Sequence, residues 1–258
     1  MNIEIETAFV RAALTGQQIG LYHEQGFLVV GRTLTDEGLD RLRSEVMEAW
    51  RSHKGAFDPD GTWLKNALLP DIHHHSRLVR DYYFDGPLVD MVGQIIGPNI
   101  KAATAQLTFK LKGNTQPFAW HQDNGYGELD PYNAISTLTA LDDVDVENGC
   151  LWLIPGSHRQ GQAAKFEGMP NVNRVIRMEV EESKAVPLVL KAGEAFLMNC
   201  WMLHQSGPNT SGRDRRILFM RYADADAVEV YNGRKPRLGR LLRGATRFPE
   251  VQVFEAEM

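Results

Sequence analysis

The chain has 258 residues, of which 43% are hydrophobic and 24% are charged, and its formal net charge is −5. This composition is typical of a globular protein with a hydrophobic core, and it argues against a partner such as nucleic acid or a membrane. The sequence shows no signal peptide, no membrane-spanning apolar stretch and no cysteine framework beyond the isolated Cys150 and Cys200, so we expect a cytoplasmic protein.

Helical signals mark three segments of the first hundred residues, at 15–26, 35–50 and 88–97. Thr15 can cap the first helix, with Gln18 placed to complete a capping box and Gly26 placed to end the helix. Thr35 can cap the second helix, and Gly97 can end the third. The sequence therefore predicts a mainly helical N-terminal part.

After residue 100 the apolar period changes from helical to alternating. In the segment 105–112, Leu107 and Phe109 share one face of a predicted strand, whereas Thr108 and Lys110 share the other. Further strands are predicted at 27–30, 134–141, 149–154, 186–190, 194–199 and 215–222. Short strands with Gly and Pro turns between them predict a mainly β sandwich or barrel, with the helices packed outside it.

The stretch Trp-His-Gln-Asp-Asn-Gly at 120–125 contains the first candidate ligands. His121 and Asp123 are two residues apart, so their side chains leave the same face of an extended strand. The simpler interpretation is a hydrogen-bonded pair, and the alternative is a metal site whose third ligand is His204, after the apolar run 195–203. Two histidines and one carboxylate leave coordination positions open, which suits non-haem Fe(II) oxygen chemistry.

Two arginines after His204 favour the metal interpretation. Arg215 and Arg216 open a predicted strand, so alternation turns one of them inward, beside the metal. A buried arginine needs an anion, and its fork of donors matches a carboxylate, which a co-substrate could supply.

Three motifs in one order resemble the phytanoyl-CoA dioxygenase-like (PhyH) family of Fe(II)/2-oxoglutarate-dependent oxygenases. They are "WHQD" at 120–123, "ENGCLWLIPGSHRQG" at 147–161 and "HQSGPNTSGRDRR" at 204–216, and the resemblance covers about residues 20–222. It implies a double-stranded β-helix, a cupin-like jelly roll, with flanking N-terminal helices. We therefore expect one domain, with a helical part over about 1–100, a jelly-roll core over about 101–225 and a C-terminal extension.

The resemblance also implies the ligands and the chemistry. Iron would be bound by His121, Asp123 and His204, and Arg215 would bind the distal carboxylate of 2-oxoglutarate. Residues implied or considered as further co-substrate contacts are Ser206, Lys110, Gln122, Thr108 and Gln106. Residues that could meet the substrate at the barrel mouth are Phe118, Asn124, Tyr126 and Trp201.

With Fe(II), 2-oxoglutarate and O2, such an enzyme hydroxylates a small-molecule substrate and releases succinate and CO2. A small polar or specialised metabolite is the expected substrate, because the motifs lack a nearby basic patch for coenzyme A. Desaturation, epoxidation and oxidative ring closure remain open as reactions of the same cofactors. The sequence gives no oligomeric state.

Two other classes of protein remain open. A zinc-dependent cupin hydrolase could use the same three ligands but would not need the Arg215 anion site. A non-catalytic binding protein on this fold would more often have lost a ligand, and all three ligands are present here. Elsewhere, the run His73–His75 looks like a metal tract. Three adjacent side chains cannot all face one ion on regular structure, so a helix-cap or surface position is expected there, and one of the three could still line the substrate mouth.

Overall fold

The computed structural model describes residues 7–57, 68–112, 117–125, 129–161, 165–167, 175–177 and 180–258. The helices are α2 (Gly16–Gln25), α3 (Asp36–Phe57), α4 (Arg77–Asp85), α5 (Pro87–Ile96) and α6 (Pro249–Val253). The first eight strands are β1 (Phe27–Arg32), β2 (Leu68–Pro70), β3 (Ile100–Lys110), β4 (Phe118–His121), β5 (Leu129–Asp130), β6 (Ile135–Ala140), β7 (Leu151–Leu153) and β8 (Lys165–Glu167). The other strands are β9 (Val175–Arg177), β10 (Val186–Pro187), β11 (Glu194–Asn199), β12 (His204–Ser206), β13 (Arg215–Asp224), β14 (Val228–Glu229), β15 (Lys235–Pro236) and β16 (Leu241–Arg243).

All three predicted helices are present, and their boundaries agree to within one residue, except that α3 continues to Phe57, beyond the predicted end at residue 50. Thr15 and Gln18 form a complete capping box at the start of α2, and Gly26 ends that helix with φ 84°. A Cβ atom on Gly26 would lie 2.3 Å from the ring of His158, so this turn requires glycine for space as well as for conformation. Thr35 accepts a hydrogen bond from the backbone of Gly38 at the start of α3. The sequence patterns missed α4, whose N-terminus is capped by Ser76.

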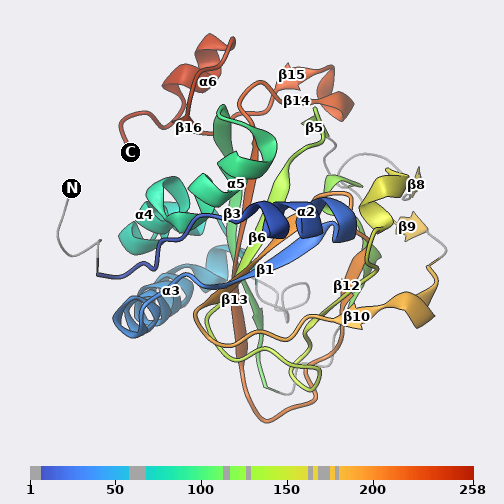
Figure 1. The fold of residues 1–258 in the computed structure, drawn as a ribbon. Coiled ribbons are helices and arrows are strands. Elements are labelled where there is room, and N and C mark those ends of the chain that lie inside the picture. Colours follow the sequence, from blue (N-terminus) through green and yellow to red (C-terminus); the bar gives the residue numbers. More distant parts are fainter. Residues whose placement is uncertain are drawn as a thin grey trace.

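Two antiparallel sheets form the jelly roll. The seven-stranded sheet has the order β1-β11-β6-β13-β3-β16, with β2 also paired to β3, and the four-stranded sheet has the order β10-β7-β12-β4. The chain crosses between distant strands, so that β1 from the N-terminal part pairs with β11 near residue 196. The expected mainly β fold, a double-stranded β-helix with flanking helices, is confirmed (Figure 1).

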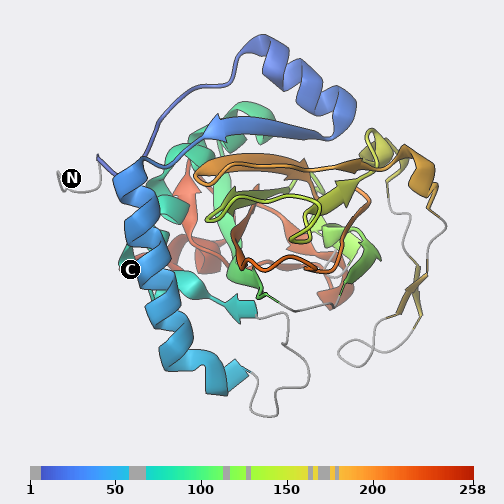
Figure 2. The same ribbon diagram turned by 90° about the horizontal axis from the view of Figure 1, so that it is seen from below.

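The helices α3, α4 and α5 lie together outside the barrel, on one side of its strands (Figures 1 and 2). Strand β3 shows why. Leu107 and Phe109 are buried in the core cluster that contains these helices, whereas Gln106 and Thr108 face the opposite way and line a cavity inside the barrel. The apolar face of β3 therefore packs on the helices, and its polar face is left for the barrel interior.

The C-terminal segment is tied to the rest of the chain by its arginines. Ion pairs join Arg234 to Asp130, Arg237 to Glu229, Arg243 to Asp85 and Asp90, and Arg247 to Asp226. Much of the basic character of this segment is thereby balanced by acids of the same chain. None of the helices in the described ranges is long and apolar enough to cross a membrane.

Candidate metal and anion site

Three candidate ligands converge at one end of the barrel interior. His121 ends β4, Asp123 begins a 3-10 turn, and His204 begins β12, the strand paired with β4. The Oδ1 atom of Asp123 lies 3.8 Å from Nε2 of His121 and 3.6 Å from Nε2 of His204. The three donor atoms all lie within 4.8 Å of one another, so the fold brings together the residues that the sequence motifs singled out.

Backbone carbonyls orient both imidazoles. Nδ1 of His121 lies 2.7 Å from the carbonyl oxygen of Ala119, and Nδ1 of His204 lies 3.1 Å from that of Met202. A carbonyl oxygen only accepts hydrogen bonds, so each Nδ1 carries the proton and each Nε2 presents a lone pair toward Asp123. Metal-binding histidines almost always have such a partner on the second ring nitrogen.

The charges at this site also suit a divalent metal. Burial and the neighbouring His204 lower the pKa of His121 to about 4, so its imidazole is neutral at pH 7. Burial alone would raise the pKa of Asp123, but His204, Arg221 and His121 together bring it below its usual value. Neutral imidazoles and an ionised carboxylate are the protonation states that bind a metal ion.

Ser136 on β6 orients the carboxylate and was not singled out from the sequence. Its hydroxyl donates a short hydrogen bond to Oδ2 of Asp123, which leaves Oδ1 directed at the two histidines. The only sequence signal for it is a small polar residue in a strand that is otherwise a candidate core strand, and that signal is too common to identify a role.

We expect Ser136→Ala to weaken metal binding by about 10- to 100-fold, because the carboxylate loses the hydrogen bond that fixes its orientation. Titration of the metal-free protein with Mn(II) or Fe(II) under argon measures the dissociation constant. Thr137→Val is the matched control. It also removes a hydroxyl from β6, but that hydroxyl donates to the backbone carbonyl of Met220 rather than to Asp123. Equal metal affinity in the two variants would contradict the role of Ser136.

Arg215 is the inward-facing arginine of β13. It is 2% exposed and lines the cavity, whereas Arg216 faces the other way and binds both carboxylate oxygens of Asp142, at 2.8 and 2.6 Å. The Nη1 atom of Arg215 donates to the backbone oxygen of Gly149 at 2.7 Å and to Oγ of Ser206 at 3.4 Å. Its Nε atom has no hydrogen-bond partner among the residues described.

Burial lowers the pKa of Arg215 to about 10, so the guanidinium stays charged at pH 7. No carboxylate forms an ion pair with it in the described part of the chain. A buried charge without a counter-ion is costly, so the site is built for an anion that comes from outside the protein. This is the position in which a carboxylate of a co-substrate would be held by two parallel hydrogen bonds.

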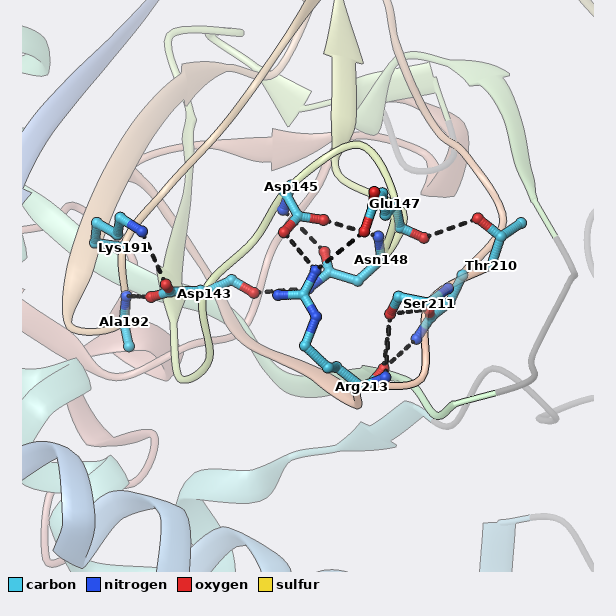
Figure 3. A network of polar contacts seen from close by, with 10 residues as sticks. Asp143, Asp145, Glu147, Asn148, Lys191, Ala192, Thr210, Ser211 and Arg213 are labelled. Carbon is cyan, nitrogen blue, oxygen red and sulfur yellow. Dashed lines mark hydrogen bonds and ion pairs between the residues drawn. The ribbon is translucent and has the colours of Figure 1, made fainter.

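A network of polar contacts fixes the loop that contacts Arg215 (Figure 3). The backbone N–H of Asp145 donates to the side chain of Asn148, and the backbone N–H of Asn148 donates to the side chain of Asp145. The side-chain amide of Asn148 also donates to the backbone carbonyl of Asp143 at 2.7 Å. Arg213 and Lys191 hold the same loop through ion pairs of 2.7 and 2.9 Å with Asp145 and Asp143. The carbonyl of Gly149 that accepts from Arg215 therefore sits at the end of a rigid turn.

The site opens into a cavity with about 570 Å³ of empty space, a volume that includes open solvent at its mouth. Eight of the residues considered from the sequence line it, namely His121, Asp123, His204, Arg215, Ser206, Thr108, Gln106 and Phe118. Five apolar residues complete the lining and had not been singled out as contacts: Leu68, Leu138, Leu151, Ile217 and Phe219. Alternation along β13 predicts Ile217 and Phe219 on the face of Arg215, but nothing in the sequence places Leu68 there.

Four other candidates within the described residues, Lys110, Gln122, Asn124 and Trp201, are not among the residues that line this cavity. Lys110 donates to the backbone oxygens of Ser206 and Gly207, and burial together with Arg215 lowers its pKa to about 7. Gln122 donates to the carbonyls of Gly161 and Trp201. The role of these two residues in binding the co-substrate stays a prediction.

The remaining substrate candidates have other surroundings. Asn124 is buried. Its side-chain oxygen accepts from the backbone N–H of Leu129, and its side-chain nitrogen donates to the backbone carbonyl of Leu129. Trp201 is buried with its ring 5.6 Å from that of Tyr132. Tyr126 lies outside the described residues. Their contact with a substrate also stays a prediction.

The chain is similar in sequence to known proteins. The sequence pattern of the phytanoyl-CoA dioxygenase (PhyH) family matches residues 22–217. A phytanoyl-CoA dioxygenase of Arabidopsis thaliana is 22% identical over 261 residues, which cover 85% of this chain and 92% of that protein.

Solved structures share the fold. A non-heme monooxygenase superposes with a TM-score of 0.72 at 24% identity, over 88% of this chain and 84% of its own. A non-heme, alpha-ketoglutarate-dependent carbocyclase from nogalamycin biosynthesis superposes with a TM-score of 0.69 at 20% identity, over 90% of this chain and 94% of its own.

Proposed function

This chain belongs to the phytanoyl-CoA dioxygenase family, and on that premise we propose that it hydroxylates a small specialised metabolite. It is an Fe(II)- and 2-oxoglutarate-dependent oxygenase, and His121, Asp123 and His204 would hold its iron. The observation that carries the proposal is the coexistence of this triad in one cavity with Arg215, a buried cation that forms no ion pair with a carboxylate of the described residues. A zinc hydrolase on the same fold would have no use for that cation.

Bound at the triad, iron with 2-oxoglutarate activates O2 for the oxidation of a C–H bond, with succinate and CO2 as co-products. The protein itself binds and orients the reactants. Arg215 would take the distal carboxylate of 2-oxoglutarate, and the hydroxyl of Ser206, which donates to the Gly149 carbonyl at 3.1 Å and accepts from Arg215, fixes the guanidinium. The neutral imidazole of His121 and the ionised carboxylate of Asp123 would hold the metal without first losing a proton.

The lining of the cavity supports a small substrate. Phe118, Leu138, Leu151, Ile217 and Phe219 supply apolar surface that excludes water and lets one part of the substrate approach the metal. Among the described residues of this lining, Arg215 is the single cation, and it is assigned to 2-oxoglutarate. The lining therefore offers no further positive charge for the phosphates of coenzyme A, which favours a compact metabolite over an acyl-CoA ester.

Two relatives, one a solved structure and one matched by sequence, support the same substrate class. The carbocyclase with this fold belongs to the biosynthesis of nogalamycin, a natural product, and an ectoine dioxygenase of Bordetella parapertussis is 24% identical over 81% of this chain. We therefore place the substrate among small polar or specialised metabolites, and we take hydroxylation as the reaction because a complete triad is present.

The test is succinate formation from 2-oxoglutarate by the purified protein with Fe(II), ascorbate and air, alone and with fractions of a metabolite extract. One fraction should accelerate succinate release above that of an Asp123→Ala control. The product formed from that fraction should contain one oxygen atom more than its substrate, and that atom should carry the label when the reaction is run under 18O2. Desaturation or ring closure would instead give a product two mass units lighter than the substrate. Absence of both 2-oxoglutarate binding and succinate release would favour a zinc enzyme or a binding protein.

A further inference from the structure

A second cluster of metal-binding side chains lies outside the catalytic cavity. His73 and His74 belong to the 3-10 turn Ile72–His74, and Glu255 follows α6 near the C-terminal end of the chain. The Nε2 atom of His74 lies 2.8 Å from Oε1 of Glu255, and Nε2 of His73 lies 3.6 Å from Oε2. Their donor atoms all lie within 4.8 Å of one another.

We propose that His73, His74 and Glu255 form a second site for a divalent transition metal, with Zn²⁺ as the best-suited ion. Two imidazole nitrogens and one carboxylate are a common ligand set for zinc, and ligands at about 2.1 Å from a tetrahedral ion lie about 3.4 Å apart. The two nitrogen-to-oxygen distances of 2.8 and 3.6 Å bracket that spacing, so small side-chain movements suffice.

His73 is the strongest part of the argument. It is 6% exposed, its Nδ1 atom has no hydrogen-bond partner among the described residues, and its Nε2 atom is too far from Glu255 for a good hydrogen bond. A buried imidazole normally finds a partner for at least one ring nitrogen. Its ring is fixed against those of Tyr83 and Phe84, at 5.5 Å each, with Nε2 on the side of Glu255.

The carboxylate also needs a cation. The side chain of Glu255 is 14% exposed, and its ion-pair partners in the described part of the chain are the two histidines. Burial and the neighbouring His74 lower the pKa of His73 to about 4, so at neutral pH His73 brings a lone pair and no charge. A bound cation would balance the charge of the Glu255 carboxylate and would also accept the lone pair of His73.

The nearby arginines are already engaged elsewhere. Arg80 donates to the carbonyl of His73, Arg237 pairs with Glu229 at 2.9 Å, and Arg240 donates to the backbone oxygen of Glu255. Beside the cluster is a space of about 490 Å³, partly open to solvent, that Arg237 also lines. The ion can therefore enter from solvent, and water can complete its coordination.

The expected effect of the ion is on stability, because it would join the turn before α4 to the C-terminal segment. A ligand that binds only the folded state raises the temperature of unfolding. The cluster is separate from His121, Asp123 and His204, so it does not depend on the proposed oxidation reaction.

The experiment measures Zn²⁺ binding in a chain whose catalytic site has been disabled by His121→Ala with Asp123→Ala. In this background we expect the chain to bind one equivalent of Zn²⁺, measured by competition with a chromophoric chelator. The temperature of unfolding should be higher with Zn²⁺ than without it. Glu255→Gln or His74→Ala should weaken binding by more than about tenfold, since even partners of metal ligands contribute 10- to 100-fold. His75→Ala, in the same histidine run but outside the cluster, should keep the affinity.

Two results would overturn the site. One is the absence of stoichiometric Zn²⁺ in the background chain, and the other is equal affinity in the Glu255→Gln, His74→Ala and His75→Ala versions. Glu255→Gln preserves the shape of the side chain, and His74 is 39% exposed, so both versions should fold, and circular dichroism checks this. Succinate formation by the single His74→Ala chain, with an intact catalytic site, should match that of the wild type.

Discussion

Asp123→Ala should lower succinate formation by more than about a thousandfold and remove stoichiometric iron binding. The carboxylate is the only anionic ligand of the triad, and replacing it leaves His121 and His204 alone to hold a divalent ion. The loss should exceed the roughly 10- to 100-fold effect of removing a partner of a ligand. Iron binding, measured by colorimetric assay after anaerobic desalting, separates lost metal from lost folding.

Asp142→Ala is the matched control for this change. The Asp142 side chain is 18% exposed and that of Asp123 is 12%, but Asp142 pairs with Arg216 on the outer face of β13. We expect the Asp142 variant to unfold at a lower temperature and still bind one iron. If Asp123→Ala retained iron and turnover, the assignment of the triad would be wrong.

Arg215→Ala should raise the KM for 2-oxoglutarate by about a hundredfold or more, with a smaller effect on the saturated rate. Removal of one partner of a buried charge pair costs about 3–5 kcal/mol, and each 1.4 kcal/mol is a factor of ten. Arg215→Lys should recover part of the affinity, because it restores the charge without the fork of donors. Steady-state succinate formation over a range of 2-oxoglutarate concentrations measures both constants.

Arg216→Ala controls for the loss of an arginine at the start of β13. It removes the pair with Asp142, so we expect a less stable protein whose KM for 2-oxoglutarate stays within about twofold of the wild-type value. If the Arg215 and Arg216 variants had equal KM values, the co-substrate carboxylate would have to bind elsewhere.

Local rules predicted several of the elements around the site, but the short strands β4 and β12 were not among the predicted strands. The capping box at Thr15, the strand 194–199 and the alternation that turns one of Arg215 and Arg216 inward all depend on residues that are close in sequence. The His-x-Asp pair could be read in the same way. His204 was a candidate third ligand from its position after an apolar run, and the family resemblance supported that choice, because only the fold brings it to Asp123.

Long-range contacts could not be predicted from the sequence. The hydroxyl of Ser136 reaches Asp123 across the barrel, and no spacing rule connects a residue on β6 with a turn after β4. Glu255 lies 181 residues from His74, its hydrogen-bond partner. His73 was expected at a cap or on the surface and is instead buried, because α4 and the C-terminal segment pack around it.

The pairing of His204 with His121 on β12 and β4 has a consequence for refolding. Side chains alternate along a strand, so a slip of one residue in the register would turn one of the two histidines to the opposite face. The irregular pairing between His204 and Ser206 restricts such slips. Iron bound per chain in a refolded preparation therefore counts the molecules whose strands have paired correctly, and it can serve as an assay of the native fraction before any substrate is known.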